Sequence, residues 1–125
     1  MAAVGEVLAL PGVQVDRSRI LVAGFSAGSG LAAHLATHED VFTALAVLHG
    51  HVLVESLGPR RVRAWLSAGD RDRVRSVAQV RATADELERR AGFREVTAPV
   101  FRADHSLGDE ELAALVAWWL GPRRD

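Results

Sequence analysis

Three residue types that cooperate in nucleophilic catalysis occur in this 125-residue chain: a serine, an acid and a histidine. Ser26 lies in the sequence Gly-Phe-Ser-Ala-Gly, and His105 lies in Asp-His-Ser. Between them, Asp70 and Asp72 share one turn. A serine hydroxyl is a poor nucleophile until a neighbouring base accepts its proton, and a histidine can be that base. A carboxylate can then orient the imidazole and stabilise the imidazolium that forms. These residues predict acyl transfer through Ser26.

The motif around Ser26 has the form G-x-S-x-G and stands between an expected strand and an expected helix. Residues 20–24 are a short apolar run typical of a buried parallel strand, and residues 29–37 are expected to be helical. In this context the motif predicts a nucleophile elbow, with a strained backbone at Ser26. We expect a side chain at Gly24 or Gly28 to collide with neighbouring backbone. Plain packing and a phosphate-binding turn are the alternatives.

The elements around the elbow alternate between strand and helix patterns. Strands separated by helices predict parallel pairing with right-handed crossovers. The sequence therefore predicts an α/β fold in one domain over residues 1–125, with about four parallel strands and helices on both faces. An opening helical stretch that lacks a cap suggests that the chain begins within a larger architecture. Further strands are expected at residues 41–48, at 62–67 and around 96–101. Further helices are expected around 77–91 and from a cap at Asp109 to Gly121, and residues 2–10 are expected to be the last turns of another helix.

The candidate residues follow different strands, and the carboxyl ends of parallel strands share one edge of a sheet. Ser26 follows the first strand, Asp70 and Asp72 follow the third, and His105 follows the fourth. Serine, acid, histidine is the order that such a fold imposes on a triad. We choose Asp72 as the acid because it lies further along the turn, and Asp70 remains the alternative. Asp104 is expected to be a solvated turn residue, and a surface position is the alternative for His105.

Residues 15–28 resemble the phospholipase/carboxylesterase group of α/β hydrolases, which includes acyl-protein thioesterases and is similar to dienelactone-hydrolase-like esterases. The shared pattern is Asp-x-x-Arg-Ile leading into G-F-S-x-G. The group's acid ends a G-x-x-D turn, which corresponds to Asp72, and its histidine matches His105. The resemblance extends over about residues 10–120. It implies a serine esterase that cleaves a small carboxylic ester or thioester through an acyl-enzyme on Ser26, without a cofactor.

The sequence also departs from this group. Its members begin with further strands and a His-Gly-rich loop that completes the oxyanion hole, and neither is found here, so we expect an N-terminally truncated domain. The resemblance implies that the Ala27 N–H is one oxyanion donor; losing the other typically costs about 10²–10³ in rate. Phe25, His49 and Gly50 are candidate pocket residues. The Gly50 backbone is a possible substitute donor, and a plain turn is the alternative.

Composition excludes several other classes of function. Hydrophobic residues make up 49% and charged residues 25% of the chain, as in ordinary globular proteins. A net charge of −1 provides no attraction for nucleic acid or a membrane surface. No apolar run approaches the roughly 20 residues of a membrane span, and no secretion signal opens the chain, so we expect a cytoplasmic protein. His34 and His38 have the spacing of a zinc pair, but no third ligand is evident, and no metal is predicted.

The expected truncation would leave residues 20–24 at an edge of the sheet. An apolar edge with free N–H and C=O groups favours pairing with another chain. We therefore expect a homodimer through this strand, or a partner chain docked on it. The alternative function is a weak or inactive hydrolase remnant that acts as an interaction or oligomerisation module.

Overall fold

The computed structural model describes residue 12 and residues 16–121. The helix expected at 2–10 lies outside these residues. None of the described helices is long and apolar enough to cross a membrane. The strands are β1 (Leu21–Phe25), β2 (Ala44–Leu48), β3 (Arg63–Gly69), β4 (Val96–Thr97) and β5 (Val100–Phe101). The helices are α2 (Ser29–His38), α3 (Val77–Arg89) and α4 (Asp109–Leu120), with short 3₁₀ turns η1 (Ser26–Gly28) and η2 (Val54–Ser56).

All strand pairs are parallel, and the sheet has the order β1-β2-β3-β4, with β5 also paired to β3. Ala64 pairs with Val96 and Ala68 pairs with Val100, so β4 and β5 keep the same register against β3. They are two parts of one strand, interrupted next to Pro99, which has no N–H to donate to a ladder. The predicted sheet of about four parallel strands is confirmed.

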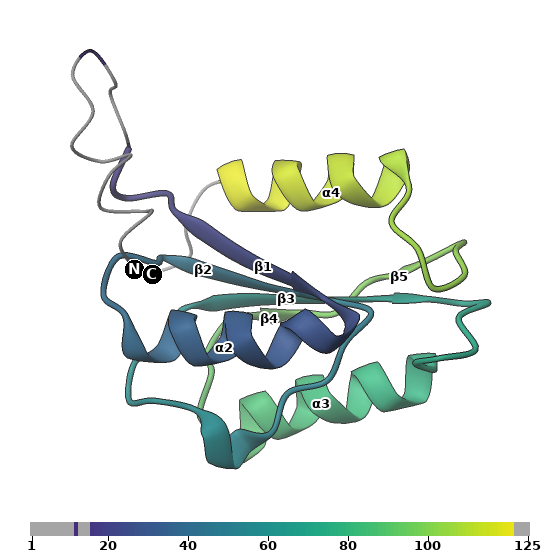
Figure 1. Ribbon diagram of the computed structural model, residues 1–125, viewed down its shortest axis with the longest axis horizontal. Helices are drawn as coiled ribbons and strands as arrows, with labels where there is room; N and C mark the ends of the chain where they lie inside the picture. Colours follow the sequence, from purple (N-terminus) through teal and green to yellow (C-terminus); the bar gives the residue numbers. More distant parts are fainter. Residues whose placement is uncertain (1–11, 13–15, 122–125) are drawn as a thin grey trace.

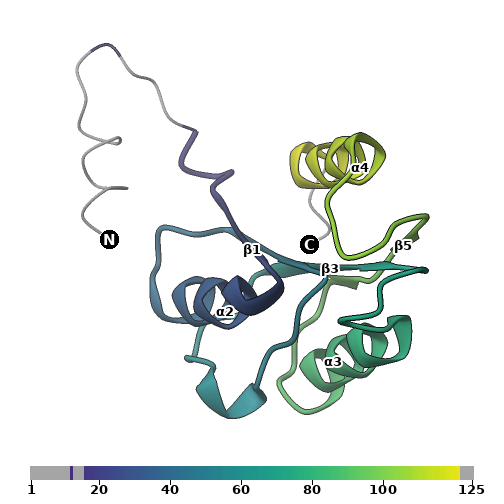
Figure 2. The same ribbon diagram turned by 45° about the vertical axis from the view of Figure 1, so that its right-hand side comes forward.

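Helices cover both faces of the sheet: α2 and α3 lie on one face and α4 lies on the other (Figures 1 and 2). Alternate strand residues divide between the two layers, as a pleated strand requires. On β3, Leu66 packs with the α2 and α3 side chains, whereas Trp65 packs with Leu115 of α4. Ser67 follows the same alternation as Trp65, and its hydroxyl contacts Glu111 of α4. Two hydrophobic layers therefore sandwich the central strands.

Several expected boundaries were wrong. β2 begins at Ala44 instead of residue 41, since the Thr43 side chain already bonds the backbone of Ile20 ahead of the ladder. The crossover from β2 to β3 holds only the η2 turn. Asp109 does not cap α4; Gly108 occupies the cap position without a side-chain bond, and Asp109 is the first helical residue.

The turn from β1 into α2 depends on one close backbone approach. A Cβ at Gly24 would lie 2.4 Å from the carbonyl oxygen of Gly28, far inside van der Waals contact. A Cβ at Gly28 would have no heavy atom within 4 Å, so the expectation of a collision there was wrong. Gly28 has ordinary right-handed helical angles (φ −73°, ψ −10°), which any residue can adopt. Only Gly24 is sterically required in this turn.

We expect Gly24→Ala to destabilise the protein by about 3 kcal/mol, because the added methyl group has to displace the main chain of the elbow. Gly28→Ala is the matched control and should change the free energy of unfolding by less than about 1 kcal/mol. Urea unfolding followed by circular dichroism measures both variants. Equal destabilisation by the two substitutions would contradict the asymmetry.

Candidate active site

Ser26 occupies a strained position at the end of the first strand. β1 ends at Phe25, and Ser26 opens the η1 turn with a φ of 53°. Positive φ is uncommon outside glycine, and strain of this kind costs about 1–3 kcal/mol. Because α2 begins only three residues later, the chain has to reverse at this point. The half-buried hydroxyl is thereby held at the carboxyl end of the sheet.

The side chains of Ser26, His105 and Asp72 are hydrogen-bonded in series. The Ser26 Oγ lies 2.8 Å from Nε2 of His105, and Nδ1 of His105 lies 2.7 Å from Oδ2 of Asp72. An ionised carboxylate only accepts hydrogen bonds, so the Nδ1 atom carries the proton. Nε2 is then free to accept the proton of the serine hydroxyl. These residues come from the turns that follow β1, β3 and β5, as the sequence order predicted for one edge of a parallel sheet.

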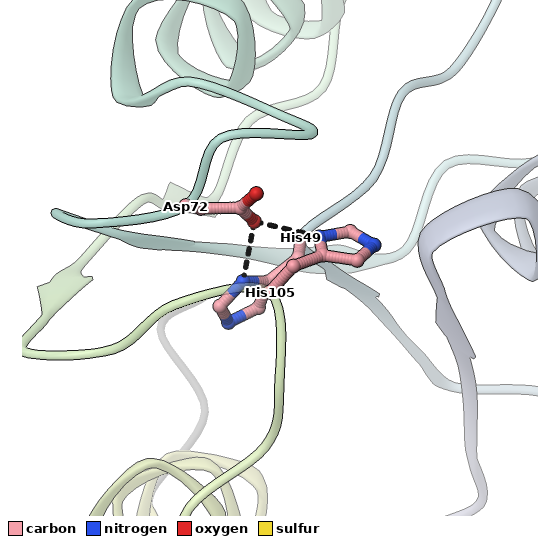
Figure 3. A group of neighbouring side chains, drawn as sticks. All are labelled: His49, Asp72 and His105. Carbon is pink, nitrogen blue, oxygen red and sulfur yellow. Dashed lines mark hydrogen bonds and ion pairs between the residues drawn. The ribbon is translucent and has the colours of Figure 1, made fainter.

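The Asp72 carboxylate is buried and fully bonded. Its Oδ1 accepts hydrogen bonds from the backbone N–H groups of Val74 and Arg75, each at 2.8 Å. Its Oδ2 accepts hydrogen bonds from the rings of His105 and His49 (Figure 3). Burial by itself would raise the pKa of Asp72. The backbone bonds and the two histidines outweigh that effect and hold the pKa well below its ordinary value. The site therefore contains a carboxylate that favours its ionised form more strongly than an ordinary aspartate does.

The alternative acids lie elsewhere. Asp70 is exposed, and its Oδ1 accepts the backbone N–H of Ala103 at 3.2 Å. The Asp104 carboxylate is bonded to the hydroxyl of Ser106. The structure therefore brings Asp72, and neither of these neighbours, into contact with His105.

A second histidine, His49, continues the hydrogen-bond series beyond Asp72. His49 follows β2, is completely buried and has a φ of 53°. Its Nδ1 lies 2.9 Å from Asp72 Oδ2, and its Nε2 lies 2.9 and 3.0 Å from the two carboxylate oxygens of Glu111. Burial lowers the pKa of His49, but the bonds to Glu111 and Asp72 outweigh this and raise it above its ordinary value.

Sequence reasoning selected His49 only as a candidate pocket residue, and it missed the bond to Asp72 and the carboxylate partner Glu111. The available signal was the placement of His49 directly after an apolar strand, at the same sheet edge as Ser26. For Glu111, an acid in the first turn of a helix is so common that its position revealed nothing.

The candidate pocket residues have different environments. Phe25 is 37% exposed, and its ring centroid lies 4.9 Å from that of His105. The His49 side chain has no accessible surface, so it does not line an open pocket. Gly50 is also buried; a Cβ there would lie 1.8 Å from the Ser29 hydroxyl oxygen, so Gly50 packs directly against the elbow. Ala27 is exposed next to Ser26.

A metal is not required to explain this cluster. Within the described part of the chain, His49, Asp72 and His105 are the one group whose possible ligand atoms lie within 4.8 Å of one another. Each Nδ1 atom already directs its proton to Asp72 Oδ2, so its lone pair is unavailable to an ion. The rings of His34 and His38 lie next to each other on the surface of α2, tilted, with centroids 4.1 Å apart. We assign no metal to either group.

Comparisons with known proteins identify the architecture. A scan against protein-family models found no match, and a search of curated proteins found none. Among solved structures, a carboxylesterase from Mesorhizobium loti matches with a TM-score of 0.67 and 24% identity over 82% of this chain and 49% of that one. A carboxylesterase from Bacillus cereus matches with a TM-score of 0.65 and 25% identity, over 83% of this chain and 50% of that one. The fold is that of an α/β hydrolase.

A further α/β hydrolase of similar fold is acyl-protein thioesterase 2 from Zea mays, with a TM-score of 0.66 and 19% identity over 94% of this chain and 62% of that one. These neighbours confirm the resemblance to the carboxylesterase and thioesterase group. The chain spans about half the length of the carboxylesterases that it resembles.

The pKa of His49 predicts how stability depends on pH. A histidine whose pKa is raised by folding stabilises the fold fully below its unfolded value of about 6.5, and this contribution is lost as pH rises through the folded value. The chain has no lysine, tyrosine or cysteine, so few other groups titrate between pH 7 and 10. We expect the free energy of unfolding to fall over this range, by at most about 1.4 kcal/mol per pH unit for one proton.

Urea unfolding at a series of pH values measures this slope. The control is the double variant His49→Asn/Glu111→Gln, which replaces the charged pair by neutral amides and should flatten the profile. Asparagine suits the control because it tolerates a positive φ better than most residues. A wild-type profile that stays level from pH 7 to pH 10 would contradict the assignment.

Proposed function

We propose that this protein is a serine hydrolase that cleaves a carboxylic ester or thioester through an acyl-enzyme on Ser26. The observation that carries the proposal is the series of short hydrogen bonds from the Ser26 hydroxyl through His105 to Asp72. This series supports the proposal, because acyl transfer requires a nucleophile, a base and an orienting carboxylate in this order. The strained backbone at Ser26 supports the proposal, since such strain clusters at functional sites.

In the proposed reaction, Oγ of Ser26 attacks the substrate carbonyl carbon while Nε2 of His105 takes the hydroxyl proton. Asp72 holds the ring through Nδ1 and stabilises the imidazolium that forms. The tetrahedral intermediate collapses when His105 returns that proton to the departing alcohol or thiol, which leaves the acyl group on the serine. Water, deprotonated by the same nitrogen, then releases the acid and restores the hydroxyl.

The oxyanion and the acyl group need neighbours of their own. The Ala27 N–H follows the nucleophile directly and is the proposed donor to the developing oxyanion. Phe25 is partly exposed beside the His105 ring and offers an apolar contact for the substrate. Carboxylesterases and a thioesterase among the structural neighbours favour esters and thioesters as the substrate class.

A fluorophosphonate probe and a short-chain nitrophenyl ester test this function. We expect the wild-type protein to be labelled and to hydrolyse the ester. Ser26→Ala should lose labelling and about 10⁴–10⁶ of kcat, because the acyl-enzyme forms on the hydroxyl that this substitution removes. Ser56→Ala removes an exposed hydroxyl in η2, outside the proposed site, and should behave as wild type. A folded wild-type protein that the probe does not label would favour the alternative of an interaction module.

We further propose that β1 is an interaction surface, with a second copy of the chain as its partner. β1 ends the described strand order, so one side of its backbone has no neighbouring strand there. Its apolar sequence, Leu-Val-Ala-Gly-Phe, lacks the charged residues that usually protect an edge. Phe25 at the end of this strand also exposes 37% of its surface.

Sedimentation velocity at micromolar concentration should show a species of about 27 kDa, twice the 13.5 kDa of one chain. Ala23→Glu places a charge at an exposed position of β1 and should shift the protein to the monomer, because edge charges oppose strand pairing. Ala78→Glu, a substitution at an exposed position of α3, is the matched control. A wild-type monomer would contradict pairing through β1.

A further inference from the structure

We propose that His49 is a positioning residue of the active site: a buried imidazolium, held by Glu111, that keeps the carboxylate of Asp72 aligned with His105. The inference rests on the proposed hydrolase function and extends it to residues outside the serine–histidine–aspartate series. His49 shares the Asp72 oxygen atom that His105 uses, so one carboxylate oxygen bonds both rings (Figure 3).

The geometry around Asp72 explains the positioning role. Oδ1 is fixed by two backbone N–H groups, which define one end of the carboxylate. Oδ2 receives both imidazole N–H groups, at 2.7 Å from His105 and 2.9 Å from His49. Without the second donor, rotation of the carboxylate would be opposed at Oδ2 only by His105, the residue that has to be oriented. His49 therefore supplies an anchor that is independent of the base.

The partners of His49 require a proton on both ring nitrogens. Nδ1 faces Asp72 and Nε2 faces Glu111, and ionised carboxylates can only accept. Glu111 is itself held by the Ser67 hydroxyl at 2.5 Å and lies in the first turn of α4, where the helix dipole favours a negative charge. Within the described part of the chain, the titratable groups that face His49 are Asp72 after β3, His105 after β5 and Glu111 from α4. The Phe25 ring of β1 lies 5.8 Å from the His49 ring, measured between centroids.

The charges of His49 and Glu111 also affect how easily His105 is protonated. The imidazolium of His49 has its ring centroid 5.9 Å from that of His105, whereas Glu111 contacts the far nitrogen of His49. The nearer member of the pair is therefore positive. It opposes protonation of His105, so removing the pair should favour the protonated base and move the acid limb of the activity profile to higher pH.

Two double variants separate positioning from folding. His49→Asn/Glu111→Gln keeps an amide N–H close to the position of Nδ1, suits the positive φ of residue 49 and leaves no unpaired charge in the interior. His49→Ala/Glu111→Gln has the same net charge but no donor to Asp72. Each is compared with wild type by urea unfolding, so that activity is interpreted only for folded protein.

The experiment combines nitrophenyl ester kinetics across pH with NMR of the imidazole protons and ¹⁵N-labelled ring nitrogens. In the wild type we expect both nitrogens of His49 to be protonated at pH 7, and a downfield proton from Nδ1 of His105. The alanine double variant should lose that downfield proton and about 10² of kcat with KM unchanged, since misalignment of about 1 Å costs this much. The asparagine variant should keep the proton and recover kcat to within about tenfold.

In both variants the acid limb of kcat/KM should move to higher pH, because loss of the more distant Glu111 charge offsets only part of the loss of the nearer cation. Wild-type kcat and an unmoved acid limb in the alanine variant would overturn the positioning role, as would a His49 nitrogen without a proton at pH 7. These results differ from failure of the hydrolase proposal, which shows as absent fluorophosphonate labelling of the wild type. The NMR comparison tests the alignment of Asp72 in that case as well.

Discussion

The arrangement of this site depends on one carboxylate. Asp72 accepts four hydrogen bonds, two from the backbone of its own turn and two from imidazole rings that other loops carry. A buried carboxylate is costly unless its oxygen atoms are bonded, and here every donor comes from a different residue. The same bonds that make the buried charge tolerable also fix the turn after β3, the loop before α4 and the end of β2 relative to one another. Stability and site geometry are thus consequences of one set of contacts.

The serine end of the series has a different origin. It is positioned by steric exclusion, because the carbonyl of Gly28 approaches Gly24 so closely that no side chain fits between them. The strain at Ser26 follows from the short distance between β1 and α2 along the chain. Packing of α2 against β1 and β2 has to offset this cost, and the buried Ala32, Ala33 and Ala36 allow the helix to lie close to the sheet.

Much of this arrangement could be predicted from sequence. Apolar runs broken by helical patterns predicted the parallel sheet, and the sheet edge shared by all strand ends led to the choice of Ser26, Asp72 and His105, which lie within hydrogen-bond distance in series. The required glycine at position 24 was recognised, but Gly28 was assigned the same role because the motif repeats the residue type without revealing which Cβ has space. The prediction that Asp109 caps α4 was wrong for a similar reason. An aspartate suits a cap position, but the helix begins one residue earlier than predicted, so Asp109 is its first residue and Gly108 is its cap.

His49 was selected from the sequence as a candidate pocket residue, but its pairing with Glu111 could not be found in this way, because that pairing depends on how α4 lies across the sheet. Residues 49 and 111 are 62 positions apart, and neither belongs to a motif. The helix is placed by Leu115, which packs against Trp65 and Leu48 on that face. Leu115 lies one turn after Glu111, so the apolar contact that seats α4 also brings the carboxylate over the end of β3, beside Ser67. How closely α4 packs on the sheet therefore determines whether Glu111 reaches His49. The buried hydrogen-bond series depends on apolar packing for this reason.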